Sequence, residues 1–152
     1  MSERFAAAAG RKVVTRASAE ELGKLAHIVV DVKSRTIASL VVGKGRKAVV
    51  VAWAQVSGFG PDAVMVAQES ALQPPGDDRE QDATSGKLDL IGKRALSDMG
   101  NELGTVTDVL FDPETGAIES IVVGDGEQPA ASLLGAGSYA VILREPAAPA
   151  AP

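Results

Sequence analysis

The chain repeats itself, and this repeat constrains its fold more than any other feature of the sequence. Residues 22–43, LGKLAHIVVDVKSRTIASLVVG, align without a gap with residues 103–124, LGTVTDVLFDPETGAIESIVVG, at a constant offset of 81. Most positions that differ exchange one aliphatic residue for another. An ungapped repeat of this length predicts two copies of one small structural unit. The identical pairs are Leu22/Leu103, Gly23/Gly104, Asp31/Asp112, Ile37/Ile118, Ser39/Ser120, Val41/Val122, Val42/Val123 and Gly43/Gly124.

Each copy has the pattern of short strands separated by turns. No segment keeps a period of 3.6 residues over three turns, and short strands at this spacing predict a small barrel or sandwich. Aromatic residues make up only 3% of the chain, so aliphatic side chains must build the core. Strands are expected near residues 12–15, 24–31, 37–43, 47–52 and 63–67, and near 93–96, 105–112, 118–123 and 138–143. The candidate core residues are Val13, Val14, Ile28, Val30, Val41, Leu110, Phe111, Ile121 and Val123.

A polar and acidic segment separates the two copies. Residues 76–87, GDDREQDATSGK, follow a Gln-Pro-Pro sequence and have the composition of a linker. Charge also divides the chain, since residues 1–72 carry a net charge of +4 and residues 73–152 a net charge of −9. This asymmetry indicates two units with different surfaces. The expected division is a first repeat at 8–70, an acidic Pro/Gly linker at 71–88, a second repeat at 89–144 and an Ala/Pro tail at 145–152.

Composition excludes several classes of site. The chain has no Cys, which excludes disulfides, thiolate nucleophiles and Cys-based zinc sites. It has no apolar run of about 18 residues, so no transmembrane helix is expected. The apolar run after MSER is too short for the hydrophobic region of a signal peptide. We therefore expect a cytoplasmic location.

The loop FDPETGAI, residues 111–118, places two acids beside a Gly, and a turn explains every one of its residues. Pro113 presets φ for the second position of a type I turn, and Asp112 can accept hydrogen bonds from backbone N–H groups ahead of it. Gly116 supplies the left-handed conformation that a short hairpin loop needs. The alternative, a calcium loop, needs Gly at its sixth position and Glu at its twelfth, where Ala117 and Val123 stand. A structural turn is therefore predicted.

The corresponding loop of the first copy, DVKSRTI, keeps the Asp but replaces both Glu114 and Gly116. Lys33 and Arg35 stand at those two positions. An acidic binding site would therefore exist in only one copy. A non-Gly residue with positive φ costs on the order of 1 kcal/mol, so Arg35 predicts a looser or differently shaped first turn.

Two longer segments resemble the PRC-barrel domain family. Residues 92–124, GKRALSDMGNELGTVTDVLFDPETGAIESIVVG, are similar to the start of such domains, and residues 49–66, VVVAWAQVSGFGPDAVMV, to their end. The second copy has no Trp that aligns with Trp53. The resemblance implies an all-β fold of two small, mostly antiparallel barrels of about six strands each. Relatives include the cytoplasmic domain of the photosynthetic reaction-centre H subunit and the C-terminal domain of a ribosome-maturation factor, which implies a scaffold rather than a catalytic site.

Candidate catalytic residues do not assemble into a site. His27 is the only His, and its counterpart in the second copy is Asp108. A strand-surface or partly buried His explains it, because no Cys or second His is present to complete a zinc site. The Ser residues lack the G-x-S-x-G pattern of a nucleophile elbow. The chain is therefore expected not to be an enzyme, and we expect no cofactor and no metal.

Two features are candidates for an interaction patch. The basic cluster GKGRK contains Lys44, Arg46 and Lys47, with Arg11 and Lys12 as neighbours, and could meet an acidic partner or phosphates. A solvated hairpin loop is the alternative, and so is packing of the basic first barrel on the acidic second one. Trp53 would either plug the core or end of a barrel, or anchor a partner.

The sequence therefore predicts a cytoplasmic, non-catalytic scaffold or adaptor that binds a protein partner through its barrel surfaces. Homodimer formation through an unpaired strand edge is a further option. The alternative is an RNA or ribosome-assembly accessory protein that uses the basic first repeat, although aromatic residues for base stacking are scarce.

Overall fold

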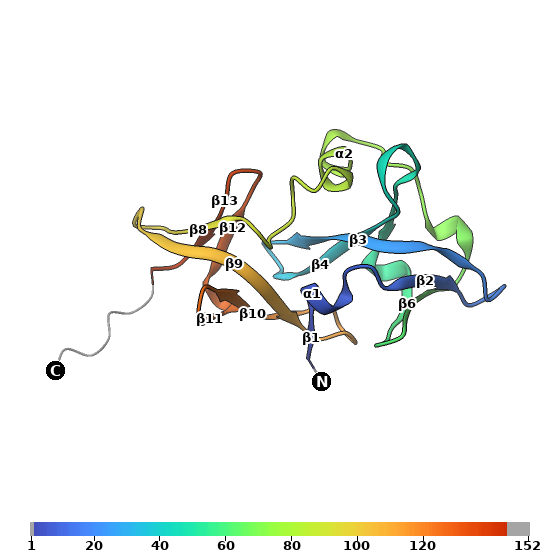
Figure 1. The fold of residues 1–152 in the computed structure, drawn as a ribbon, viewed down its shortest axis with the longest axis horizontal. Coiled ribbons are helices and arrows are strands. Elements are labelled where there is room, and N and C mark those ends of the chain that lie inside the picture. Colours follow the sequence, from blue (N-terminus) through green and yellow to red (C-terminus); the bar gives the residue numbers. More distant parts are fainter. Residues whose placement is uncertain (1, 146–152) are drawn as a thin grey trace.

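The two sequence repeats form two sheets of the same strand order (Figure 1). The computed structural model describes residues 2–145. The first repeat contains β2 (Lys12–Thr15), β3 (Glu21–Asp31), β4 (Thr36–Val42), β5 (Val49–Ala52), β6 (Val56–Phe59) and β7 (Ala63–Val66). The second contains β8 (Arg94–Ser97), β9 (Glu102–Phe111), β10 (Ile118–Val123), β11 (Gly126–Pro129), β12 (Leu133–Ala136) and β13 (Ala140–Leu143). Short 3-10 turns lie between these elements, namely η1 (Gly45–Lys47), η2 (Trp53–Gln55), η3 (Glu69–Ala71) and η4 (Ala130–Ser132).

Each sheet is barrel-like and mostly antiparallel, which confirms the predicted fold class. The strand orders are β5-β4-β3-β2-β7-β6 and β11-β10-β9-β8-β13-β12. Among the strands of residues 2–145, only the pairs β2–β7 and β8–β13 are parallel. Within the described residues neither sheet closes into a complete barrel, because β5 does not pair with β6 and β11 does not pair with β12. In each repeat a 3-10 turn, η2 or η4, joins these two end strands at the open seam.

Most buried apolar residues of the two sheets form one continuous core, and a second, smaller cluster that includes Val41 lies on the outer face of the first sheet. The β-branched residues that favour strands also fill the continuous core, since Ile28 and Val30 of β3 and Ile118, Ile121 and Val123 of β10 are all buried. Of the expected core residues, Val14 and Leu110 are only half-buried. The others are buried, namely Val13, Ile28, Val30, Val41, Phe111, Ile121 and Val123.

The two repeats meet at their first hairpin turns around a local two-fold axis. Thr36 forms an antiparallel bridge with Ala117, which is its own counterpart at the offset of 81. The backbone N–H of Ile37 donates to the carbonyl of Gly116 at 2.8 Å, and the N–H of Ile118 donates to the carbonyl of Arg35 at 2.9 Å. Such reciprocal contacts between equivalent residues define a two-fold interface. The two repeats therefore associate like the subunits of a dimer.

The turn at 112–116 has the hydrogen bonds of a closed loop. The Oδ1 atom of Asp112 accepts from the N–H of Glu114 at 2.9 Å, Gly116 has φ of 78°, and its N–H donates to the Asp112 carbonyl at 2.7 Å. Pro113 lies between them and has no N–H to satisfy. The carboxylate of Asp112 therefore accepts a backbone hydrogen bond that stabilises the turn.

The expected difference in shape between the two turns is wrong. In the first copy Asp31 Oδ1 accepts from the N–H of Lys33 at 3.0 Å, and Arg35 has φ of 55°. Arg35 thus adopts the conformation that its Gly counterpart adopts in the second copy. The pairing of the two turns fixes this backbone, and the Arg35 Nε atom donates to the carbonyl of Leu133 at 3.2 Å. These contacts with the second repeat offset the free-energy cost of a positive φ at Arg35.

The segments that lead into the two sheets are exchanged between the repeats. The first leader, residues 3–9, contains β1 (Glu3–Arg4) and α1 (Phe5–Ala8), and β1 pairs with β9 of the second repeat (Figure 1). The second leader, residues 86–91, lies against β3 of the first repeat, where Asp89 contacts His27. Equivalent hydrogen bonds tie each leader to its own sheet, since Gly10 N–H donates to the Leu25 carbonyl and Gly92 N–H to the Val106 carbonyl, both at 2.8 Å.

A row of aromatic rings crosses between the repeats. The ring of Phe111 lies 5.3 Å from that of Phe5 and 5.2 Å from that of Phe59, both in edge-on geometry. Trp53 continues the row, with its ring 5.8 Å from Phe59. Phe111 belongs to the second repeat, whereas the other three rings precede β8 in the chain. The two sheets therefore share their largest buried side chains.

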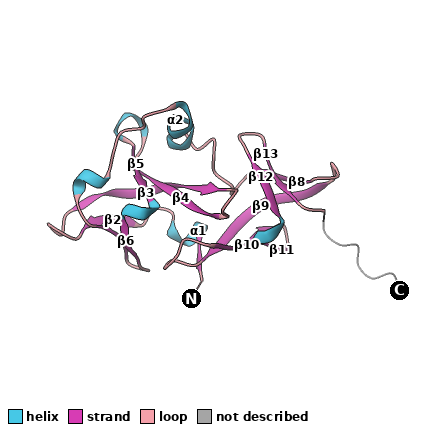
Figure 2. Cartoon of the chain, turned by 180° about the vertical axis from the view of Figure 1, so that it is seen from behind, coloured by secondary structure: helices cyan, strands magenta, loops and turns pink. Residues whose placement is uncertain are grey.

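The segment expected to be a linker folds into a helix. The helix α2 (Asp78–Thr84) covers the outer face of the first sheet, where Ala83 packs with Val29, Val41 and Val50 (Figure 2). Asp77 caps it, because its Oδ1 atom accepts from the N–H of Glu80 at 2.7 Å. The acidic residues that indicated a solvated linker are thus the first turn of a helix. No helix in the described part of the chain is long and apolar enough to span a membrane.

Candidate interaction surface

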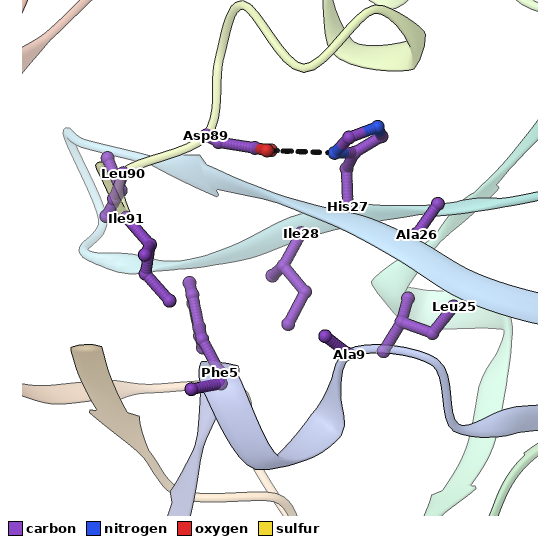
Figure 3. Close-up of a pocket in the computed structure, with 10 residues that line it drawn as sticks. Phe5, Ala9, Leu25, Ala26, His27, Ile28, Asp89, Leu90 and Ile91 are labelled. Carbon is purple, nitrogen blue, oxygen red and sulfur yellow. Dashed lines mark hydrogen bonds and ion pairs between the residues drawn. The ribbon is translucent and has the colours of Figure 1, made fainter. Parts of the chain in front are cut away.

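An apolar hollow lies between the two leaders and the middle of β3 (Figure 3). Its volume is about 370 Å³. Phe5, Leu25, Ile28 and Leu90 form its floor and are nearly fully buried, whereas Ala6 and Ala9 of the first leader are exposed at its edge. Pockets of this size and apolar lining suit a side chain or a small apolar group of a partner. The exchange of the leaders therefore creates a concave surface that neither sheet would form by itself.

His27 and Asp89 form an ion pair or hydrogen-bonded pair at the rim of this hollow. The Nδ1 atom of His27 lies 2.9 and 3.1 Å from the two carboxylate oxygens of Asp89 (Figure 3). Gly86 allows this approach, because a Cβ atom there would lie 3.2 Å from Cε1 of His27. The described residues place no Ser or Thr hydroxyl in hydrogen bond with His27, and they contain no group of three or more acids and His that could hold a metal ion. The pair can bind and orient, but no nucleophile is positioned beside it.

A second hollow, of about 780 Å³, adjoins the first and has a basic rim. The two share Ala9, Leu25, Ala26 and His27 in their walls, so together they form one groove. Lys24 and Lys44 line the second hollow, together with the Gly residues of the 43–45 loop. The groove therefore changes along its length from apolar to cationic.

Five exposed cations surround the basic end of the groove. Lys12 and Lys24 are direct cross-strand partners in β2 and β3, and the carbonyl of Lys24 accepts the N–H of Gly43 at 2.9 Å. This places the loop that begins with Lys44 beside Lys24. Among residues 2–145 none of the five forms an ion pair with an acid. We call them the basic patch: Lys12, Lys24, Lys44, Arg46 and Lys47.

Arg11 was expected as a neighbour of this cluster, but its charge is paired with an acid of the same chain. Its side chain is only 8% exposed, and its guanidinium bonds Glu3 at 2.9 Å and the carbonyl of Gly60 at 2.8 Å. It also lies over the ring of Phe59, 5.3 Å from the ring centre. Arg11 thus holds the first leader in place and does not extend the basic patch.

Trp53 lies away from the groove, at the contact between the repeats. It is half-buried in η2 and lines a separate hollow of about 270 Å³ with Phe59 and Pro113. Its indole lies so close to Gly116 that a Cβ atom there would be 2.7 Å from Nε1. The structure therefore does not bring Trp53 together with Lys44, Arg46 and Lys47.

Sequence reasoning did not identify Lys24 or the leaders as parts of this surface. Lys24 is separated by about twenty residues from the GKGRK loop, and only the pairing of β3 with β4 brings them together. A usable signal was present in the alignment of the repeats, where Lys24 and Lys44 are replaced by Thr105 and Asp125. Basic residues found in only one of two copies are better candidates for a site than residues shared by both.

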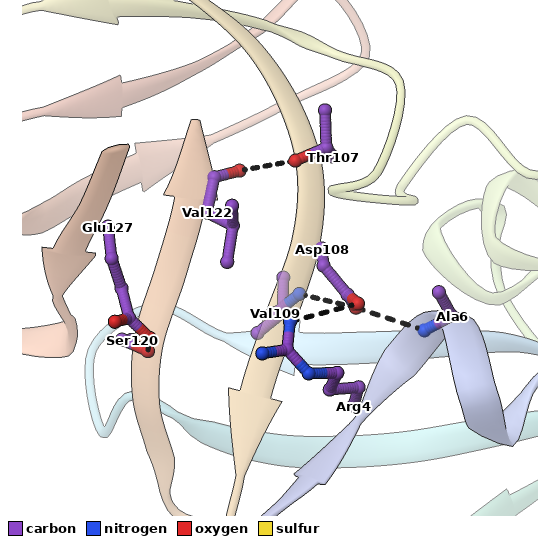
Figure 4. Close-up of polar contacts among 8 residues, drawn as sticks. All are labelled: Arg4, Ala6, Thr107, Asp108, Val109, Ser120, Val122 and Glu127. Carbon is purple, nitrogen blue, oxygen red and sulfur yellow. Dashed lines mark hydrogen bonds and ion pairs between the residues drawn. The ribbon is translucent and has the colours of Figure 1, made fainter. Parts of the chain in front are cut away.

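Asp108 positions the first leader and, through it, one wall of the groove. Its Oδ1 atom accepts from the N–H groups of Ala6 at 3.0 Å and Val109 at 2.9 Å, and Arg4 lies 3.5 Å from Oδ2 (Figure 4). Asp108 is the counterpart of His27 in the second repeat. Asp108 contacts the first leader and His27 contacts the second, so each of these two residues contacts the leader that crosses over from the other repeat.

Replacing Asp108 with Ala should therefore loosen the first leader. Its side chain is only 13% exposed, and a hydrogen bond to a charged, partly buried acceptor contributes about 1.5–3 kcal/mol. We expect a loss of about that size in the free energy of unfolding, with faster amide exchange at Ala6. Asp108→Asn keeps an acceptor oxygen and should lose less than half as much. Equal losses in the two variants would mean that the charge of Asp108, and not its hydrogen bond, holds the leader.

Comparison with protein families identifies both repeats. The family model described as the PRC-barrel domain matches residues 5–73 and residues 88–141. These segments contain the first sheet with most of its leader, and the second sheet up to the middle of β13 with most of its leader. A search of the curated proteins finds no match for this chain.

Proposed function

The chain belongs to the PRC-barrel domain family, with two copies in tandem, and from this premise we propose that it is a non-catalytic scaffold that binds another protein in the cytoplasm. The observation that carries the proposal is the groove with its basic patch, which combines a buried apolar floor with cations that have no acid partner within residues 2–145. Protein interfaces combine such an apolar centre with a polar rim. Complementary charge adds speed and selectivity to the encounter.

A catalytic function has less support from the same geometry. The His27–Asp89 pair is the one candidate acid–base group at the groove, and no hydroxyl is hydrogen-bonded to it among the described residues. General acid–base catalysis also needs a reacting group within hydrogen-bond reach of the imidazole. We therefore propose a role for this pair in binding.

The basic patch also supports the second candidate, an RNA or ribosome-assembly accessory protein. Sequence-independent RNA binding needs cations along a groove and aromatic faces for the bases. Here Phe5, Phe59 and Phe111 are buried in the shared core, and Trp53 packs between the repeats. The exposed Tyr139 lies on the second repeat and is hydrogen-bonded to Arg94 at 2.9 Å. Base stacking at the basic patch is therefore poorly supported, and a protein partner fits better.

Capture of partners from lysate of the source cell, with and without RNase, tests this proposal. The tagged chain should retain a discrete set of proteins after RNase treatment. Lys44→Glu/Arg46→Glu should lose this set, because two reversed rim charges remove attraction and add repulsion. The control Arg16→Glu/Arg144→Glu reverses two exposed charges that lie outside the groove and should retain it.

Other outcomes of this capture experiment would indicate a different function, a different surface or a different partner. Ribosomal proteins or RNA that RNase removes would favour the RNA accessory function. A protein set that both double variants retain would place the interaction elsewhere on the barrels. A tagged chain that captures only untagged copies of itself would identify the partner as a second copy.

A further inference from the structure

We propose that the groove binds an extended segment of a partner protein in which an apolar side chain is adjacent to acidic residues. The apolar side chain would occupy the hollow between the leaders, and the acidic residues would lie along Lys24 and Lys44. This inference rests on the proposed function and names the chemistry of the partner. Four observations on the described residues carry it.

The first observation is the shape and lining of the apolar end. Leu25 and Ile28 of β3, Phe5 of the first leader and Leu90 of the second leader point to one hollow of about 370 Å³ (Figure 3). The lining residues come from both leaders and from β3, so a side chain that enters the hollow would contact all three. Removing apolar surface from water stabilises a complex, which makes a Leu or Phe side chain a suitable anchor.

The second observation is the position of His27 where the two hollows meet. Asp89 engages Nδ1, and the described residues offer no hydrogen-bond partner to Nε2. A bound segment could therefore hydrogen bond to Nε2 through its backbone. This contact would fix the direction in which the bound segment runs from the apolar end to the cationic end of the groove.

The third observation is an unfavourable charge arrangement that the fold retains. Lys12 and Lys24 are directly opposite in an antiparallel pair, and like charges at such positions are destabilising. The second repeat avoids this cost, because Arg94 is opposite Thr105 there and forms an ion pair with Glu102 at 2.8 Å. Only the first of the two equivalent sheets retains this repulsion between two lysines. The retained repulsion indicates that these lysines bind an external anion.

The fourth observation is the form of the charged surface, which favours a peptide over a membrane or RNA. Lys24 and Lys44 line a concave wall next to buried apolar residues, and the same groove also contains Ala9 and Ala26. A lipid surface needs a protruding apolar face, and single-stranded RNA needs exposed aromatic faces. An extended peptide needs only an apolar side chain with acidic residues next to it in the chain.

Fluorescence anisotropy with defined probes tests this inference on the full chain. The probe is a fluorescein-labelled octapeptide with two Leu residues followed by four Asp or Glu residues. The comparison probes replace either its acids with Asn and Gln or its Leu residues with Ser. An octanucleotide of RNA and vesicles of phosphatidylglycerol and phosphatidylcholine represent the other polyanions. We expect binding of the first peptide to weaken about tenfold or more in each comparison peptide, since each lost group contributes about 1.4 kcal/mol or more.

Matched variants separate the groove from general electrostatics. Lys24→Glu/Lys44→Glu should weaken peptide binding about tenfold or more, whereas Arg16→Glu/Arg144→Glu should leave it within about twofold. Lys24→Glu also turns a repulsive cross-strand pair into an attractive one, so this variant should be at least as stable as the parent chain. Lower affinity with unchanged or higher stability is a result that damage to the fold cannot produce. Ala9→Gln, at an exposed position with φ of −58°, should block the groove without replacing a charge.

Several results would overturn the inference. They are equal binding of the acidic and neutral peptides, equal binding by the groove variant and its control, or tighter binding of the RNA or the vesicles through the same lysines. If lysate capture still depends on Lys44 and Arg46 while no peptide binds, this inference fails and the proposed scaffold function stands. If lysate capture yields only RNA-dependent material, the scaffold proposal itself fails.

Discussion

Replacing Phe111 with Ala is expected to lower the free energy of unfolding by about 3–5 kcal/mol, as for other fully buried Phe residues. Phe111 has no exposed surface and contacts the rings of Phe5 and Phe59. Those two rings come from the first leader and from the first repeat. The substitution leaves a cavity at the centre of the shared core, so we expect both repeats to be destabilised together.

Urea denaturation followed by two probes measures this coupling. Trp53 is the only Trp and reports on the first repeat and its contact with the second, whereas far-UV circular dichroism reports on both sheets. For a single cooperative unit, Phe111→Ala shifts both transitions to the same lower midpoint. The control Met99→Ala is in the same repeat and removes a side chain that is 72% exposed, so it should change stability by no more than about 0.5 kcal/mol. An unchanged Trp53 transition in Phe111→Ala would mean that the repeats unfold independently.

The sequence indicated the two sheets but not the core that joins them. An alternating strand such as β10 shows which of its side chains face inward, and Ile121 and Val123 are buried as expected. Alternation does not show what lies opposite, because an apolar face packs equally well on its own barrel or on a neighbour. The exchange of the leaders is determined by packing between residues about one hundred positions apart, such as Phe5 and Phe111. No local pattern contains that information.

The turn around Arg35 shows how a tertiary contact overrides a local preference. A residue with a Cβ atom disfavours positive φ by on the order of 1 kcal/mol, and this predicted a different first turn. The Arg35 backbone nevertheless has φ of 55°, because its carbonyl pairs with Ile118 and its side chain bonds the Leu133 carbonyl. Both partners belong to the second repeat. The sequence of the turn alone could not reveal them.

The candidate surface was predictable only where its residues are neighbours in sequence. Lys44, Arg46 and Lys47 are exposed and form a recognisable local cluster, of which Lys44 lines the groove. Lys24 reaches the same place through strand pairing. Arg11 carries the same charge but is neutralised by Glu3, which only the path of the first leader brings near. A local run of basic residues identifies part of a charged surface, and ion pairing between distant segments decides which charges remain available.

Replacing Gly116 with Ala is expected to lower the free energy of unfolding by about 2–4 kcal/mol, from two separate causes. The first is backbone strain, since φ of 78° costs a residue with a Cβ atom about 1 kcal/mol. The second is overlap with the indole of Trp53, because the new Cβ atom would lie 2.7 Å from Nε1 and 2.8 Å from Cε2. Overpacking of a fitted contact typically costs about 1–3 kcal/mol.

A matched Gly and a double-mutant cycle separate these causes. Gly124 has φ of 58° and no atom within 4 Å of an added Cβ, so Gly124→Ala should show the backbone cost of about 1 kcal/mol alone. In a Trp53→Ala background, Gly116→Ala should fall to the same value, which gives a coupling energy of about 1–3 kcal/mol between the two positions. Circular dichroism is the appropriate probe, because this background lacks Trp fluorescence. Equal costs of Gly116→Ala with and without Trp53 would mean that the indole moves aside freely, and that Trp53 does not hold the two repeats together at this turn.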